Sequence, residues 1–142
     1  MVYSPLVLKA SLIAYNVHKE DFDKSGYPYV MHPFYLAFGM EDEITTCVAL
    51  LHDVIEDHGD RFSLEMFEKE GFPREVIDAL RLLAHSPDVP YMDYVRALAD
   101  DPVAKKVKIA DLMHNSDRSR MGGKPFYKES LYREALEYLT KN

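Results

Sequence analysis

The chain of 142 residues has the length of one domain, and its 47% hydrophobic and 29% charged residues are typical of globular rather than disordered or fibrous proteins. Its net charge of −7 argues against a nucleic acid or an anionic membrane as a partner. Its single cysteine, Cys47, excludes an internal disulfide, and neither a membrane-spanning apolar run nor a basic signal-peptide segment is seen. We therefore expect one cytoplasmic domain over residues 1–142.

Signals for the beginning and end of helices recur along the chain, whereas the alternating Val, Ile and Thr runs of strands are missing. Ser4 before Pro5 is the preferred order at a helix N-terminus, and Asp42 and Ser63 are further candidate caps. The predicted helices cover residues 5–19, 33–39, 43–57, 63–71, 73–83 and 126–140, with two more beginning at Pro90 and Pro102. Residues 21–29, rich in Gly, Pro and small polar side chains, are predicted to form a loop. The predicted fold class is all-α, a single helical bundle of about seven or eight helices.

The charge is unevenly distributed along this bundle. Residues 1–104 carry 8 Lys and Arg against 19 Asp and Glu, whereas residues 105–142 carry 9 against 5. Such a balance is typical either of an ordinary solvated surface or of a site that joins a metal cation to a small phosphorylated ligand.

The helix predicted over 43–57 is apolar on nearly all sides, which is typical of a buried helix. It nevertheless carries four polar groups at neighbouring helical positions: His52, Asp53, Glu56 and Asp57. Burying unpaired like charges is unfavourable, and a bound divalent cation would relieve the conflict. The alternative is an acidic patch that faces water beside a buried histidine.

A second polar group follows downstream on a helix that is otherwise rich in apolar residues. Its members fall on one face: Lys108, Asp111, Asn115 and Arg118. Taken alone, this face is also consistent with solvated intrahelical pairs.

These residues complete the order His…His-Asp…Asp, which is the signature of the HD superfamily of metal-dependent phosphohydrolases. Within it, the chain resembles the hydrolase domain of RelA/SpoT-type enzymes and the stand-alone small alarmone hydrolases. The similarity runs from about residue 10 to 120 through His18, Ser-Gly-Tyr-Pro-Tyr-Val-Met-His-Pro at 25–33, Leu-Leu-His-Asp-Val-Ile-Glu-Asp at 50–57, and Val-Lys-Ile-Ala-Asp-Leu at 107–112 with Asn115. The resemblance implies an HD-domain fold, and the synthetase and regulatory domains of the larger enzymes would have no room here.

The resemblance also implies roles for individual residues. One divalent ion, Mn²⁺ in many members, would be bound by His18, His52, Asp53 and Asp111. Glu56 and Asp57 would orient or deprotonate the attacking water. The nucleotide and its phosphates would contact Lys24, Ser25, Lys108 and Asn115. Tyr29 and His32 are expected to support the pocket rather than bind the ion, because the preceding Gly-x-Pro-Tyr turn already accounts for the presence of His32.

The implied reaction is hydrolysis of the 3′-pyrophosphate of a guanosine alarmone, (p)ppGpp, with Lys108, Arg118 and Lys24 as cations for the diphosphates. Two departures bear on the substrate: Asp23 and Asp117 stand where related enzymes often have arginine. An HD phosphohydrolase for another nucleotide or phosphate ester is the alternative, and a binding module without turnover is a third possibility. Whether the chain forms a homo-oligomer stays open.

Overall fold

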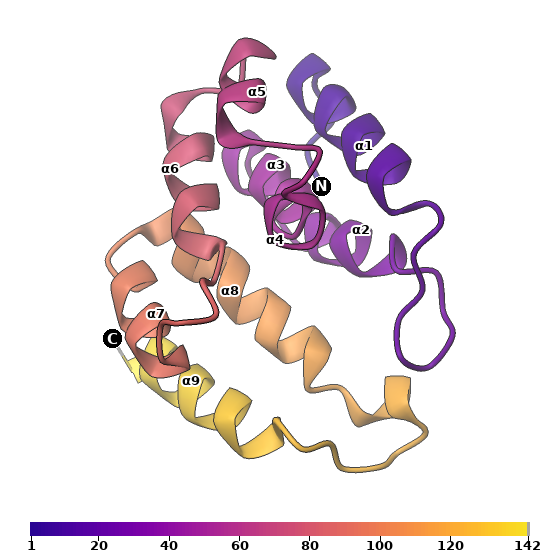
Figure 1. The fold of residues 1–142 in the computed structure, drawn as a ribbon, viewed down its shortest axis with the longest axis vertical. Helices are drawn as coiled ribbons and strands as arrows, with labels where there is room; N and C mark the ends of the chain where they lie inside the picture. The colour runs from indigo at the N-terminus through magenta and orange to yellow at the C-terminus, as the bar shows by residue number, and fades with distance from the viewer. Residues whose placement is uncertain (142) are drawn as a thin grey trace.

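The structure, a computed structural model, describes residues 1–141, and this part of the chain is helical with no strand beyond one isolated bridge (Figure 1). The helices are α1 (Pro5–His18), α2 (Met31–Phe38), α3 (Glu43–Leu51), α4 (Val54–His58), α5 (Leu64–Lys69), α6 (Arg74–Leu83), α7 (Tyr91–Leu98), α8 (Pro102–Asn115), the 3-10 helix η1 (Arg118–Met121) and α9 (Glu129–Lys141). The all-α prediction is confirmed. Within residues 1–141, no helix is long and apolar enough to cross a membrane.

Side-chain caps begin several of these helices as predicted. Ser4 Oγ accepts a hydrogen bond from the Val7 amide at 3.2 Å, and Asp42 Oδ1 accepts one from the Thr45 amide at 2.8 Å. Each bond satisfies an amide that a helix N-terminus would otherwise leave unpaired. Helix α2 begins at Met31 rather than at Pro33, and the proline lies in the first turn, where no amide donor is needed. Helix α9 begins later than predicted, at Glu129.

The predicted helix over 43–57 is wrong as a single element, because the chain breaks after Leu51 into α3 and α4. Asp53, at φ −101° and ψ −2°, lies at the N-terminus of α4, where Glu56 and Asp57 in the first turn interact favourably with the helix dipole. This break raises the number of helices above the predicted seven or eight. His52 and Asp53 therefore form the corner between the two helices.

Helix α3 lies at the centre of the core. Its residues 45–51 are all buried, and it packs against α1, α2, α6 and α8. Figure 1 shows α8 running between the side of the bundle that holds α2 and α3 and the side that holds α7 and α9. The corner at His52 and Asp53 therefore lies against two helices far apart in the sequence, α2 and α8.

The predicted loop at residues 21–29 is confirmed and forms a small hairpin. Phe22 and Pro28 form an antiparallel bridge, and Asp23 Oδ1 accepts the amides of Ser25 and Tyr27 at 2.9 and 3.0 Å. Gly26 has a φ of +92° at its tip, a conformation that a side chain disfavours. The loop therefore holds Lys24 and Ser25 at the rim of the bundle.

Candidate metal centre

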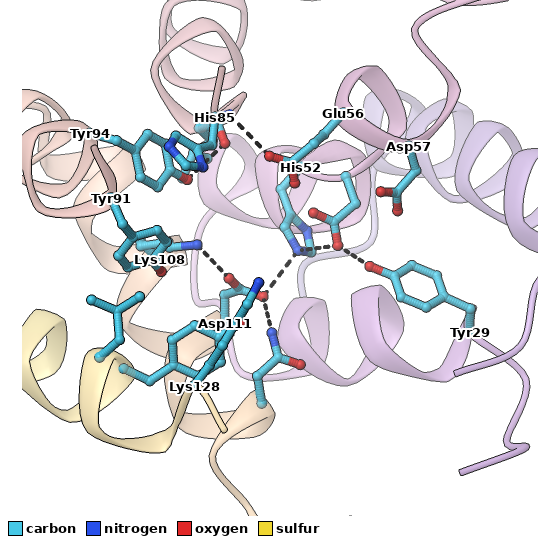
Figure 2. Close-up of a pocket in the computed structure, with 15 residues that line it drawn as sticks. Tyr29, His52, Glu56, Asp57, His85, Tyr91, Tyr94, Lys108, Asp111 and Lys128 are labelled. Atoms are coloured by element: carbon cyan, nitrogen blue, oxygen red, sulfur yellow. Dashed lines mark hydrogen bonds and ion pairs between the residues drawn. The ribbon is translucent and has the colours of Figure 1, made fainter. Parts of the chain in front are cut away.

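The corner between α3 and α4 directs the side chain of His52 toward a pocket at the centre of the bundle (Figure 2). His52 Nδ1 donates a hydrogen bond to the carbonyl oxygen of Ala49 at 2.7 Å, which directs Nε2 toward the pocket. Among the described residues, this buried Nε2 has no hydrogen-bond partner of good geometry. The hydroxyl of Tyr29 donates to Asp53 Oδ2 and orients that carboxylate. The corner thus presents a free imidazole nitrogen beside a carboxylate.

Four side chains from three parts of the chain meet at this corner, with one ligand atom each within 4.8 Å of the others: His32, His52, Asp53 and Asp111. His52 Nε2 lies 3.0 Å from Asp53 Oδ2 and 3.4 Å from Asp111 Oδ1. His32 Nε2 lies 2.9 Å from the same Asp111 oxygen. Two imidazoles and two carboxylates form a donor set that suits several first-row divalent ions. These residues fit such an ion, which would also satisfy the unpaired nitrogen of His52.

The structure brings together three of the four predicted ligands but not His18. His32 is the fourth member of the group, although its predicted role was only to support the pocket. The first turn of α2 directs His32, which is only 2% exposed, toward α8. His18 ends α1 and instead groups with Asp21 and His58.

Asp111 is the most heavily engaged member of the centre. Besides the two histidines, Lys108 Nζ donates to Asp111 Oδ2 at 2.9 Å and Asn115 Nδ2 donates to Oδ1 at 3.0 Å. Burial alone would raise the pKa of Asp111, but Lys108 and the histidines outweigh it and hold that pKa well below its usual range. Asp111 is therefore a permanently ionised carboxylate at the floor of the pocket.

Lys108 is itself enclosed by the pocket wall. Its Nζ lies 5.6 and 5.2 Å from the ring centres of Tyr91 and Tyr94, a cation–π arrangement. Burial opposes the ammonium charge, yet Asp111 and the two tyrosines raise the pKa of Lys108 well above its usual value. Lys108 and Asn115, both predicted to contact substrate, line the pocket as expected, but each is also bound to Asp111.

His32 is held from behind by a stack of rings. Its Nδ1 lies 2.7 Å from His114 Nδ1, and the two rings are nearly parallel at 5.0 Å. Tyr35 covers the other face of His114 at 4.1 Å. Burial and nearby Arg120 lower the pKa of His114 to about 4, so that His114 stays neutral and can accept a hydrogen bond from His32 Nδ1. This bond leaves His32 Nε2 available to an ion.

Glu56 and Asp57 face the same pocket from the first turn of α4 (Figure 2). Glu56 Oε1 accepts a hydrogen bond from the amide of His85 at 3.1 Å, which fixes its position. Desolvation and the negative charges of Asp53 and Glu56 raise the pKa of Asp57 to about 6. A carboxylate with that pKa can take up a proton near neutral pH.

A second pocket adjoins the first, and the two share Tyr29, Asn115, Lys128 and Tyr132 as lining residues. Its further walls are aromatic and basic: Phe22, Phe126, Tyr127, Lys24 and Arg120. Lys24 Nζ lies 5.5 Å from the ring centre of Tyr127, and Ser25 also lines this pocket. Aromatic rings and cations together suit a nucleobase and its phosphates.

The two arginines of η1 have different partners. Arg120 lies 3.6 Å from Asp23 and donates to the carbonyl oxygen of His114 at 2.8 Å, at the wall of the second pocket. Arg118, predicted to share the polar face of Asp111, lies beyond the end of α8 and binds Glu129 through two guanidinium nitrogens, Nε and Nη2. Arg118 therefore does not share the face of Asp111, and its role as a cation for a diphosphate stays a prediction.

Sequence reasoning missed several residues of the two pockets: Tyr91, Tyr94, Arg120, Lys128 and Tyr132. Their helices or loops were predicted, but the orientation of the tyrosines depends on how α7 packs against α6 and α9 and how α9 packs against α8. His114 could have been found, because it follows Asp111 by three residues and so lies on the same side of its helix.

Known proteins resemble this chain in sequence and in fold. No protein-family model matches the chain. A probable GTP pyrophosphokinase of Mycobacterium leprae (strain TN) is 34% identical over 125 residues, which cover 78% of the chain but only 15% of that protein. A solved structure described as a metazoan ortholog of SpoT that hydrolyses ppGpp has a TM-score of 0.73 at 22% identity, over 99% of this chain and 86% of that one. The chain thus shares the fold of that hydrolase and resembles RelA/SpoT-type proteins.

Proposed function

We propose that this chain is a divalent-metal-dependent hydrolase that removes the 3′-pyrophosphate of (p)ppGpp. The observation that carries the proposal is the convergence of His32, His52, Asp53 and Asp111, with a ligand atom of each within 4.8 Å of the others, at the floor of a pocket. The ppGpp-hydrolysing activity of the structural neighbour supports the choice of substrate. The net reaction adds water to the 3′-phosphorus, breaks its bond to the ribose oxygen and returns a proton to that oxygen.

His32, His52, Asp53 and Asp111 would hold the ion, which we propose to be Mn²⁺. When bound, such an ion supplies Lewis-acid polarisation of phosphoryl oxygens and of water. Two neighbours keep the nitrogen ligands in the required tautomers: the carbonyl of Ala49 accepts from His52 Nδ1, and His114 accepts from His32 Nδ1. Tyr29 and Asn115 orient the carboxylates of Asp53 and Asp111.

Asp57 is the proposed general base. Its pKa is about 6 without the ion, so Asp57 is ionised near neutral pH and can take a proton from the attacking water and release it to solvent. Glu56, fixed by the amide of His85, is the proposed positioning group for that water. Its negative charge also contributes to the raised pKa of Asp57.

The second pocket is the proposed place of the nucleoside. Tyr127 and Phe126 offer ring faces for the base, whereas Lys24 and Lys128 offer charge to the 5′-diphosphate. Asp23, which stands where related enzymes often have arginine, binds Arg120 instead. We infer that Arg120 supplies from η1 the guanidinium that position 23 does not.

The test is incubation of the full chain with ppGpp and Mn²⁺, followed by ion-exchange separation of the nucleotides. GDP and pyrophosphate are expected, and pppGpp should give GTP. Asp53→Asn is the matched control, because it removes one ligand charge and should abolish the reaction. If another nucleotide or a phosphodiester is hydrolysed while ppGpp stays intact, the alarmone proposal fails and a broader HD phosphohydrolase replaces it.

A further inference from the structure

Three residues outside the metal centre form a second group of potential ligands: His18, Asp21 and His58. His18 ends α1, Asp21 follows in the next loop and His58 is the last residue of α4. His18 Nδ1 lies 3.1 Å and His58 Nε2 lies 2.7 Å from the same Asp21 oxygen, Oδ2. One carboxylate oxygen therefore faces two imidazole nitrogens from separate elements.

We propose that His18, Asp21 and His58 bind a second divalent transition-metal ion of the zinc class, separate from the ion of the metal centre. Two histidines and one carboxylate on one side of an ion leave its remaining positions open to water or to a ligand oxygen. Asp21 and His58 line a surface pocket, and Asp57 and Glu20 line it too. These two carboxylates add negative charge that favours a cation there.

The charge states of His18 and Asp21 suit metal ligands before any ion binds. His18 is 1% exposed and packs its ring against Tyr29 at 4.9 Å, so its position is fixed. Burial lowers the pKa of His18. Hydrogen bonds from His58 and His18 lower the pKa of Asp21. A neutral imidazole and an ionised carboxylate are the protonation states that metal ligands need.

His18 and His58 each need a change of tautomer to bind the ion, because the nitrogen of each that faces Asp21 carries a proton. His58 Nδ1 accepts a hydrogen bond from Arg61 at 3.1 Å, so that Nε2 carries the proton that faces Asp21. An ion at Nε2 requires that proton to move to Nδ1, and Arg61 is exposed and free to turn away. The net charge of His58 is unchanged by this exchange.

A purely structural role would tie the end of α1 to α4 through two ordinary hydrogen bonds. The two roles differ in a measurable quantity, the number of ions that the folded chain holds. The inference does not depend on the proposed hydrolase activity.

The experiment is equilibrium dialysis of the full chain against Zn²⁺, followed by metal analysis. The wild type is expected to hold two ions per chain, whereas His58→Ala and Asp21→Asn should each hold one. Asp60→Asn, which removes an exposed carboxylate two residues beyond His58, is the matched control and should hold two. Asp53→Asn should lose the ion of the metal centre and keep the second ion.

A second measurement uses the Asp53→Asn chain and NMR of its histidine rings. Addition of paramagnetic Co²⁺ should broaden the signals of His18 and His58 before that of His85. Circular dichroism confirms that each variant is folded. The proposal is overturned if folded His58→Ala and Asp21→Asn hold as many Zn²⁺ ions as the wild type. Absence of ppGpp hydrolysis would refute the proposed function and leave these ion counts unaffected.

Discussion

Asp57→Asn tests the proposed general base most directly. The substitution removes the proton acceptor but keeps the shape of the side chain, and Asp57 is not among the four side chains of the metal centre. A positioned acid–base group contributes about 10²–10⁴-fold in rate, or about 2.7–5.4 kcal/mol of transition-state stabilisation. We therefore expect turnover of ppGpp to fall by that factor, with the affinity for Mn²⁺ unchanged.

The pKa of Asp57 predicts how the activity of the wild type depends on pH. Because Asp57 acts as a base, the active form is the carboxylate, and activity falls as pH drops through its pKa. Without an ion that pKa is about 6, and the ion would lower it toward the ordinary value of 3.8. The acid limb of kcat/KM should therefore have its midpoint between these values, with a tenfold loss per pH unit below it.

Glu56→Gln separates the two carboxylates. The neutral amide can still accept the hydrogen bond from the His85 amide, but it removes a negative charge that raises the pKa of Asp57. The midpoint of the acid limb should move to lower pH, and the plateau should fall less than in Asp57→Asn. Pyrophosphate release at saturating Mn²⁺ measures both, with Asp60→Asn as the control. If Asp57→Asn keeps turnover within about tenfold of the wild type, the assignment of the base is wrong.

Four further changes test other parts of the site. His32→Ala should abolish binding of Mn²⁺ at the metal centre, measured by calorimetry, and unchanged affinity would remove His32 from the ligand set. His114→Phe keeps the ring stack but removes the acceptor for His32 Nδ1, so the Mn²⁺ affinity should fall about 10–100-fold, whereas His114→Gln should recover part of it. Lys108→Met leaves the buried Asp111 without its cation, so urea unfolding in a chelator should show a loss of about 3–5 kcal/mol, partly recovered with Mn²⁺; an unchanged midpoint would contradict this. Arg120→Ala should raise KM for ppGpp several-fold with little change in kcat, and an equal fall in both kcat and kcat/KM would place Arg120 in the chemical step instead.

Local signals in the sequence were sufficient for most of the fold. The caps Ser4, Asp42 and Ser63 lie where predicted, because a cap acts on amides within three residues of itself. The break between α3 and α4 was missed because the apolar pattern continues through it. Contacts from distant residues hold the two residues at the break: Tyr29 donates to the carboxylate of Asp53, and Asp111 approaches His52.

His32, and not the predicted His18, lies at the metal centre, and this difference shows what the motif alone cannot determine. Either histidine satisfies the order His…His-Asp…Asp, and both are buried, so neither order nor burial distinguishes them. The difference is tertiary: α2 packs against α8, which carries Asp111, whereas the end of α1 packs against α4, which carries His58. A buried imidazole needs a partner for each nitrogen. His32 has Asp111 and His114 as partners, both on α8, whereas His18 has Asp21 at Nδ1 and no partner at Nε2 among the described residues.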